Sequence, residues 1–130
     1  NMINFKSPEV EVDVSAEMLY NKLSNVNNLR NILPPQVSEF QSTEDSCCFK
    51  IGGMPTIHLE ITEKIPNSKI SLIAKDSQVP FTLECNISEN GDMAKATLEI
   101  NAELNMMMKM MLEKPLANFL NSASEGLKKL

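Results

Sequence analysis

The chain is poor in the side chains that most often transfer protons or bind transition metals. It has no tryptophan, a single tyrosine (Tyr20) and a single histidine (His58). Histidine is the residue whose ordinary pKa lies nearest neutral pH, and the chain has only this one for acid–base work. One histidine and three scattered cysteines are too few converging ligands for zinc. We therefore expect no metal site and no cofactor.

Basic residues are also scarce, because 12 lysines and arginines stand against 17 acidic residues and the net charge is -5. Nucleic-acid binding depends on basic residues that displace counterions, so this balance argues against a nucleic-acid partner. No apolar run approaches the ~18 residues of a membrane span, so we expect no integral membrane association. No basic segment followed by an apolar run opens the chain, which predicts no signal peptide.

The cysteines do not make a disulfide framework. Cys47, Cys48 and Cys85 are an odd number with one adjacent pair, which favours reduced thiols and a cytoplasmic protein. The length of 130 residues favours one domain, since two would leave about 65 residues each, near the lower limit for a separate core. We expect a single domain over residues 1–130 and interpret Asn1, before Met2, as a cloning remnant.

The opening segment from Ile3 to Val14 alternates between apolar and polar residues in two registers. Ile3 and Phe5 share one parity, whereas Val10, Val12 and Val14 share the other. Ser7-Pro8 lies where the parity changes, which predicts a bulge in a long edge strand.

Two short helices are predicted to follow this strand. Asp13 or Ser15 can cap the first, and Pro34-Pro35 stops the second, which spans Asn27 to Leu33. The helical spacing of the first segment places its apolar residues at Met18, Leu19, Leu23 and Val26.

From Val37 to Leu104 the apolar residues recur with the period of a strand. The predicted strands are Val37 to Ser42, Ser46 to Ile51, Thr56 to Lys64, Lys69 to Asp76, Phe81 to Ser88 and Met93 to Leu104. Short turns such as Asn90-Gly91 join them, so consecutive strands are expected to pair antiparallel.

After Asn105 the period becomes helical. The apolar stripe runs through Met108, Leu112, Leu116, Phe119, Leu120, Ala123, Leu127 and Leu130. Pro115 interrupts the stripe, so we expect a kink or a break there. The predicted fold is α+β of the helix-grip type: a curved antiparallel sheet of about seven strands wraps around the long C-terminal helix, with two short helices after the first strand.

This order resembles the START-like, or SRPBCC, helix-grip superfamily, which includes polyketide cyclases. The resemblance is carried by Ser15-Ala-Glu-Met-Leu-Tyr-Asn-Lys-Leu, by Val26-Asn-Asn-Leu-Arg-Asn-Ile, by the run of hairpins and by Leu112-Glu-Lys-Pro-Leu-Ala-Asn-Phe-Leu. It implies a cavity between sheet and last helix that holds an apolar or amphipathic small molecule. Because the resemblance is topological and has no shared catalytic motif, it implies no catalytic residue.

The residues assigned to the inward face of the four long strands include no ionisable acid or base except the thiol of Cys85, whereas His58 falls on the polar parity. These inward residues are Ile57, Leu59, Ile61, Ile70, Leu72, Ala74, Phe81, Leu83, Cys85, Ile87, Ala94, Ala96, Leu98, Ile100 and Ala102. Ala94, Ala96 and Ala102 leave room that larger side chains would fill. We predict a ligand-sized cavity of ~300–1,000 Å³, the alternative being a core filled by the C-terminal helix. The predicted ligand-binding residues are Leu59, Leu72, Leu83, Ala96, Leu98, Ile100, Met108, Leu112 and Phe119.

Five methionines lie within residues 106–111, and one or two of them are expected to be exposed on a helix. They indicate core filling, an adaptable ligand lining or a protein partner that binds through segment 106–111.

The leading hypothesis is non-catalytic binding of a hydrophobic or amphipathic small molecule. A protein–protein adaptor on the same fold is the alternative, and a cyclase- or hydratase-like enzyme is a third.

Overall fold

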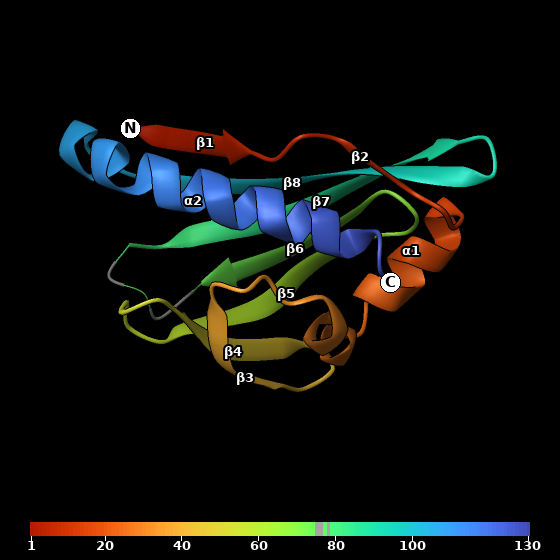
Figure 1. Ribbon diagram of the computed structural model, residues 1–130, viewed down its shortest axis with the longest axis horizontal. Helices are drawn as coiled ribbons and strands as arrows, with labels where there is room; N and C mark the ends of the chain where they lie inside the picture. Colours follow the sequence, from red (N-terminus) through yellow and green to blue (C-terminus); the bar gives the residue numbers. More distant parts are fainter. Residues whose placement is uncertain (75–76, 78) are drawn as a thin grey trace.

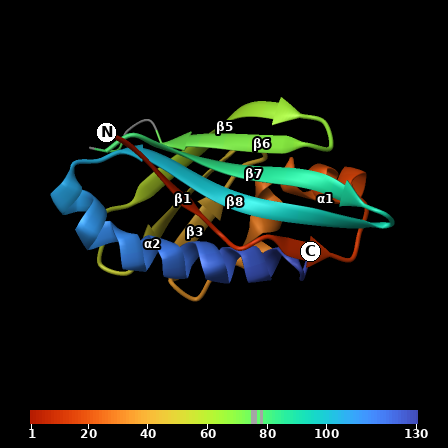
Figure 2. The ribbon, with the colours of Figure 1, turned by 90° about the horizontal axis from the view of Figure 1, so that it is seen from above.

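In the computed structural model, which describes residues 1–74, 77 and 79–130, a curved antiparallel sheet wraps around one long helix (Figures 1 and 2). The strands are β1 Met2–Lys6, β2 Val10–Val12, β3 Val37–Ser42, β4 Ser46–Ile51, β5 Ile57–Ile65, β6 Lys69–Ala74, β7 Phe81–Asn90 and β8 Met93–Glu103. The helices are α1 Ala16–Leu23, the 3-10 helix η1 Val26–Ile32 and α2 Met106–Leu127. The predicted helix-grip α+β fold is confirmed.

The sheet has the strand order β1-β8-β7-β6-β5-β4-β3, with β2 also paired to β8. Every pairing is antiparallel, as the short turns predict. The sheet gains an eighth strand because the predicted opening strand is divided into β1 and β2. The predicted end of the strand beginning at Lys69 falls on Lys75 and Asp76, which lie outside the described residues.

The division between β1 and β2 is the bulge expected at Ser7-Pro8. Lys6 pairs with Glu99 and Val10 with Ala96, so residues 7–9 stand opposite residues 97–98. The Ser7 amide donates to the Leu98 carbonyl at 2.8 Å, and Ser7 Oγ accepts from the Leu98 amide at 2.9 Å. The side chain thus replaces a backbone acceptor that the extra residue displaces.

The opposite edge strand, β3, is irregular as well. Its pairing with β4 shifts register between Ser38 and Gln41, and Glu39 has a φ of 53°. Left-handed backbone is unusual for a residue with a Cβ, so β3 bends at this point.

Side-chain caps fix where α1 and η1 begin. Ser15 Oγ accepts from the Met18 amide at 3.1 Å, and Asn25 Oδ1 accepts from the Asn27 amide at 3.1 Å. Helix α1 buries Ala16, Leu19 and Leu23. The interpretation of Met18 as an apolar-face residue is wrong, because that side chain is exposed.

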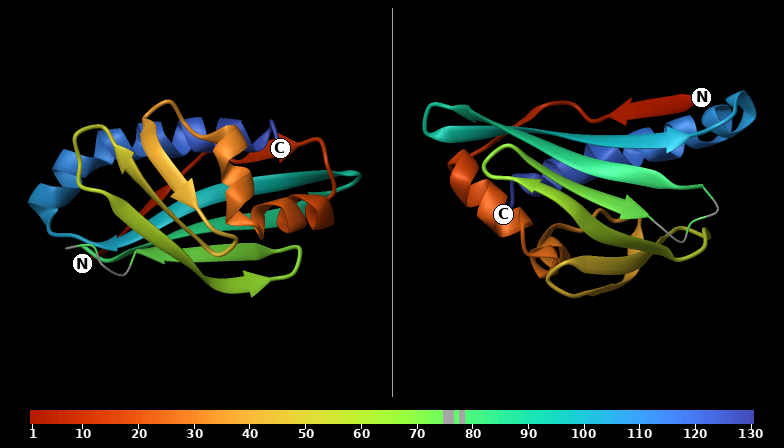
Figure 3. Two further views of the ribbon diagram at one scale, coloured as in Figure 1. Left: turned by 90° about the horizontal axis from the view of Figure 1, so that it is seen from below. Right: turned by 180° about the vertical axis from the view of Figure 1, so that it is seen from behind.

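Helix α2 crosses the concave side of the sheet and contacts β1, β2, β8 and η1 (Figures 2 and 3). Of the kink or break expected at Pro115, the break does not occur, because α2 runs from Met106 to Leu127 as one helix, whose first turns are bent relative to the rest (Figure 2). Proline removes one backbone donor, but Leu112 and Leu116 pack against the same core on both sides of it. Burial therefore outweighs the loss of one hydrogen bond.

The C-terminal end of α2 lies against η1 at a glycine. A Cβ added to Gly126 would stand 2.6 Å from the carbonyl oxygen of Ile32, so only glycine permits this approach. In the part of the chain that the structure describes, no helix is long and apolar enough to span a membrane.

Candidate functional site

An apolar cavity of about 100 Å³ lies between the sheet, η1 and α2. Helix α1, η1, strands β3 to β8 and helix α2 all contribute to its wall. The lining residues are Leu23, Leu29, Ile32, Leu33, Pro34, Val37, Phe40, Cys47, Phe49, Leu59, Ile70, Leu72, Leu83, Cys85, Leu98, Phe119, Ala123 and Leu127. The two thiols are the only polar side-chain groups among them.

The cavity brings together five of the predicted ligand-binding residues: Leu59, Leu72, Leu83, Leu98 and Phe119. The other four are Ala96, Ile100, Met108 and Leu112, and they belong to the core but do not line this space. Ala96 pairs with Val10 of β2 and Ile87 of β7, toward the end of the sheet that α1 covers.

Sequence reasoning missed the wall formed by the early elements. Leu29 and Ile32 come from η1, Phe40 from β3, and Cys47 and Phe49 from β4. The signal was present, because Phe40, Cys47 and Phe49 occupy the apolar parity of strands whose bounds were predicted. Only the four longer strands had been assigned an inward face, and a periodicity argument alone does not place η1 over them.

The volume of the cavity lies below the predicted range. The alternative, a core completely filled by α2, does not describe the structure either. Ligand pockets are usually ~300–1,000 Å³, whereas an engineered cavity of about 150 Å³ is enough to bind benzene. Phe40 and Phe49 stack with ring centroids 6.3 Å apart and occupy part of the space. At about 100 Å³ the interior is smaller than that engineered cavity, so as it stands it has room for a ligand no larger than one small ring or a short alkyl chain.

Burial keeps both cavity thiols protonated. It raises the pKa of Cys85 to about 12, and burial together with the neighbouring Cys48 raises the pKa of Cys47 to about 12. The reactive form of cysteine is the thiolate, so neither side chain is a nucleophile near neutral pH. They add polarisable, weakly polar surface to an otherwise hydrocarbon wall.

Charged side chains of the central strands gather on the opposite face of the sheet. Glu84 and Glu99 face one another across β7 and β8. Lys69 Nζ lies 3.6 Å from Glu84, Lys6 Nζ lies 3.1 Å from Glu99, and Asn86 Nδ2 donates to Glu99 at 3.1 Å. Glu63 and Glu84 raise the pKa of Lys69. These carboxylates are neutralised outside the cavity, where they cannot act on a ligand inside it.

Three further polar residues, Tyr20, Arg30 and His58, also lie away from the cavity wall. His58 is exposed on β5. Arg30 donates to the Phe40 carbonyl at 3.3 Å, and its guanidinium carbon lies 5.3 Å from the centroid of the Phe40 ring. Tyr20 is half-buried and packs against the core. Arg30 therefore packs against Phe40, which lines the cavity, but does not itself line the cavity.

A wider depression of about 340 Å³ lies on the outer surface of α1. Its wall consists of Ser15, Glu17, Met18, Asn21, Lys22 and Asn28, most of them exposed. It is shallow and polar, and nothing encloses it. Among the described residues there is also no group of histidine, cysteine and carboxylate side chains able to hold a metal ion.

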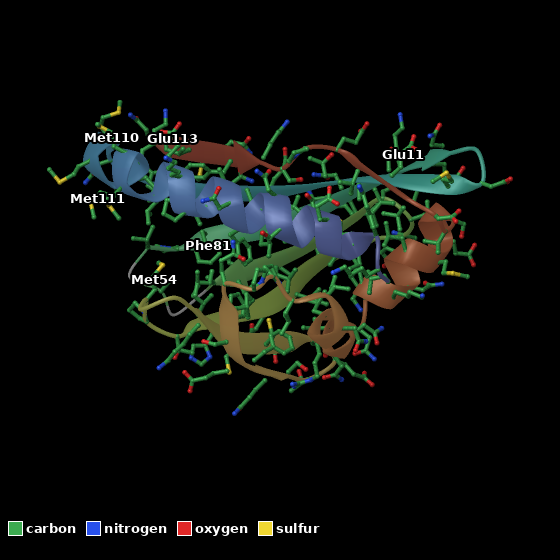
Figure 4. All side chains as sticks on the ribbon, viewed as in Figure 1. Glu11, Met54, Phe81, Met110, Met111 and Glu113 are labelled. Carbon is green, nitrogen blue, oxygen red and sulfur yellow. The ribbon has the colours of Figure 1, made fainter. Side chains whose placement is uncertain are left out.

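The methionine segment is more exposed than expected. Met106, Met107, Met110 and Met111 have 66–72 % of their surface exposed, and Met108 alone of the five turns inward. The first turns of α2 extend past the end of the sheet, so there is no strand beneath them to cover these side chains (Figures 1 and 3). Figure 4 shows Met110 and Met111 at this free end, above Met54 of the β4–β5 loop.

Comparisons with known proteins inform the fold and not the ligand. No protein-family model and no curated protein matches the sequence. A START superfamily protein from Mycobacterium smegmatis is similar in structure at 13 % identity, with a TM-score of 0.69 over 98 % of this chain and 97 % of that one. An aromatase/cyclase from a Streptomyces species gives 11 % identity and 0.68 over 99 % and 95 %.

A third similar structure is the di-domain aromatase/cyclase of the steffimycin biosynthetic pathway. It gives 11 % identity and a TM-score of 0.74 over 98 % of this chain and 50 % of that one. The likeness covers nearly the whole chain in all three comparisons. Together with the strand order and the position of α2, it shows that this protein has the START-like helix-grip fold.

Proposed function

We propose that the protein binds a small hydrophobic or amphipathic molecule in the cavity beneath α2. The observation that carries the proposal is the composition of the cavity wall, which is apolar apart from two protonated thiols. Such a wall favours a neutral ligand through buried apolar surface, at roughly 25 cal/mol per Å² before association costs. Similar folds include a START superfamily protein and aromatase/cyclases, which agrees with use of this space for apolar compounds.

The same wall supports a non-catalytic role, which is part of the proposal. General acid–base catalysis needs a carboxylate, histidine, lysine or tyrosine within reach of the reacting atoms, and none of the described residues that line the cavity is of these types. A cyclase- or hydratase-like reaction would have to recruit groups that lie elsewhere in the structure. We also propose that the protein works in a reducing compartment such as the cytoplasm, which the three free thiols support.

The direct test is to fill the cavity. Ala123 lines it and Ala117 is exposed on the same helix, so Ala123→Leu and Ala117→Leu form a matched pair. Benzene is expected to raise the thermal midpoint of the native protein and of Ala117→Leu, because a ligand that binds only the folded state stabilises it. Ala123→Leu is expected to abolish that shift while remaining folded by circular dichroism. An equal shift in all three proteins would contradict the proposal.

The natural ligand is best sought by native mass spectrometry of protein purified from its own host. An added mass that organic extraction releases, and that Ala123→Leu lacks, would identify it. Protein that carries no such mass and also fails to respond to benzene would leave the cavity without a function.

A second candidate function is that of a protein–protein adaptor, favoured by the exposed methionines of segment 106–111. Flexible thioether side chains adapt to partners of different shape. The double substitution Met110→Glu and Met111→Glu is expected to abolish a co-purifying partner if one binds there, and to leave benzene binding unchanged.

A further inference from the structure

The first turns of α2 are apolar on both sides. Their inward side, which includes Met108 and Leu112, packs against the core. Their outward side is a methionine face formed by Met106, Met107, Met110 and Met111. At about 3.6 residues per turn these four residues share a face roughly 140° wide, opposite the inward side. A helix that is apolar all round is normally buried, so we expect a further surface to cover the methionine face.

The area of the methionine face limits what kind of partner can cover it. Its four residues are 66–72 % exposed, which leaves on the order of 500 Å² of surface, toward the upper end of the largest apolar patch on an ordinary monomer. Two such faces packed together bury on the order of 1,000 Å², which is the least that a specific protein interface needs. A second copy of this chain therefore supplies a face of sufficient size, although the resulting association is weak.

The charges at the two ends of the methionine face suit antiparallel pairing of two copies. Glu103 precedes α2 with its side chain 65 % exposed, and the exposed Lys114 continues the face one turn beyond Met110. A parallel pair would place the two Lys114 ammonium groups side by side. In an antiparallel pair centred on the methionine face, Met107 of one copy faces Met110 of the other, and Lys114 of one copy comes near Glu103 of the other.

A lipid surface suits the methionine face less well. Helices that lie on membranes carry tryptophan, phenylalanine or leucine on their apolar face, and anionic lipids attract basic proteins. The methionine face has no aromatic residue, and the net charge of the chain is -5. This charge opposes dimerisation only weakly, because salt screens exposed charges beyond about 8 Å and the segment itself carries Lys109 and Lys114 against Glu113.

We propose that the protein forms a weak symmetric dimer in which the methionine faces of two copies pack antiparallel. Both copies contribute the same residues, so the association closes at two chains. The first turns of α2 extend past the sheet, and Figure 4 shows Met110 and Met111 pointing away from it, so two copies can approach here. The proposal does not rest on the small-molecule function, because the part of α2 that lines the cavity is the other end, at Phe119, Ala123 and Leu127.

Sedimentation equilibrium of the full chain tests the dimer. The native protein is expected to be monomeric at about 1 µM and increasingly dimeric above ~100 µM, as suits an interface of minimal size. Met110→Glu brings two carboxylates into the centre of the interface and is expected to raise the dissociation constant of the dimer at least about tenfold. Met18→Glu, the same change at a methionine of α1 that is 49 % exposed, is expected to leave the constant unchanged.

An exchange of charges tests the antiparallel arrangement. Glu103→Lys turns two attractive contacts into repulsive ones and is expected to raise the dissociation constant about three- to tenfold. Adding Lys114→Glu to the same chain reverses both partners and is expected to restore the native constant. A parallel pair predicts no such rescue, because residues 103 and 114 do not meet in it.

A native protein that stays monomeric up to about 1 mM, or a Met110→Glu variant that dimerises like the native protein, would overturn the proposal. Absence of the rescue would overturn the antiparallel arrangement. Binding of a monomeric native protein to phosphatidylcholine vesicles, lost in Met110→Glu, would assign the face to a lipid surface and overturn the dimer. Benzene binding is measured separately on each protein: its absence from all of them would contradict the cavity function and leave the dimer standing.

Discussion

The two halves of α2 share one continuous helix but lie in opposite environments. Residues 119–127 press against the cavity and η1, burying Phe119, Leu120 and Leu127, and Gly126 lies against Ile32. The first turns of α2, by contrast, extend past the sheet and expose Met106, Met107, Met110 and Met111, and only Met108 of the five methionines packs against the core. The first half is helical because Asn105 caps it, with its Oδ1 accepting from the Met108 amide at 2.8 Å, and because methionine favours helix. The second half is held by burial.

The buried C-terminal half of α2 therefore contributes to the stability of the fold, whereas its exposed N-terminal end is available for interactions. The cavity needs only the C-terminal half as its wall, whereas the N-terminal half is free to change without altering that wall. Substitutions in the two halves are therefore expected to differ in kind, and the following predictions test the difference in order of expected size.

The largest effect is expected for Leu120→Ala. Leu120 is fully buried, so the variant loses about 3–4 kcal/mol of unfolding free energy through lost burial and a new cavity. Met110→Ala, at a side chain 72 % exposed, is expected to change it by less than about 0.5 kcal/mol. Urea denaturation measures both, and similar losses would refute the division of α2 into two environments.

Gly126→Ala is expected to destabilise the protein by about 1–3 kcal/mol, because the new methyl group collides with the backbone of Ile32. Helix propensity alone predicts the opposite sign, a gain of about 1 kcal/mol for alanine over glycine. Asn118→Ala, at an exposed position of α2, supplies the control and is expected to be close to neutral. A stabilised Gly126→Ala variant would mean that η1 is not held tightly against α2.

The cavity wall facing the C-terminal half predicts a loss of stability at alkaline pH. In the folded protein burial raises the pKa of Cys47 and Cys85 to about 12, from the ordinary value of 9.0. The unfolded chain therefore binds fewer protons than the folded chain once the pH exceeds about 9, and stability falls as the pH rises from there toward 12. Denaturation at several pH values is expected to show a shallower decline in Cys85→Ala. If the stability of Cys85→Ala falls as steeply with pH as that of the native protein, Cys85 is excluded as a cause.

The smallest effect is expected from oxidation of the exposed half. Dilute hydrogen peroxide converts accessible methionines to sulfoxides, and peptide mapping is expected to find Met106, Met107, Met110 and Met111 modified before Met108. The unfolding free energy is expected to change by less than about 0.5 kcal/mol, since these side chains contribute little buried surface. Early modification of Met108 would contradict the orientation of the helix.

The elements of this fold are readable from the sequence where the signal is local. The change of parity at Ser7-Pro8, the strand period from Val37 onward and the stripe of α2 each depend on neighbours within a few residues. The cavity could be predicted from the sequence only in part, because its wall joins residues far apart in the chain. Leu29 and Leu98 line the same cavity through tertiary packing that no periodicity specifies. The size of the cavity depends on how Phe40, Phe49 and Phe119 fill it.

The irregularities at the two margins of the sheet have a consequence for the protein's behaviour in concentrated solution. A free strand margin is a template on which another chain can add its own strand, which leads to polymers. Here the margin formed by β1 and β2 is interrupted at Ser7 and Pro8, and proline has no amide proton to offer. The margin formed by β3 is bent at Glu39. The protein exposes methionines at one end, but neither margin of its sheet presents an unbroken row of backbone donors and acceptors to which a further strand could pair.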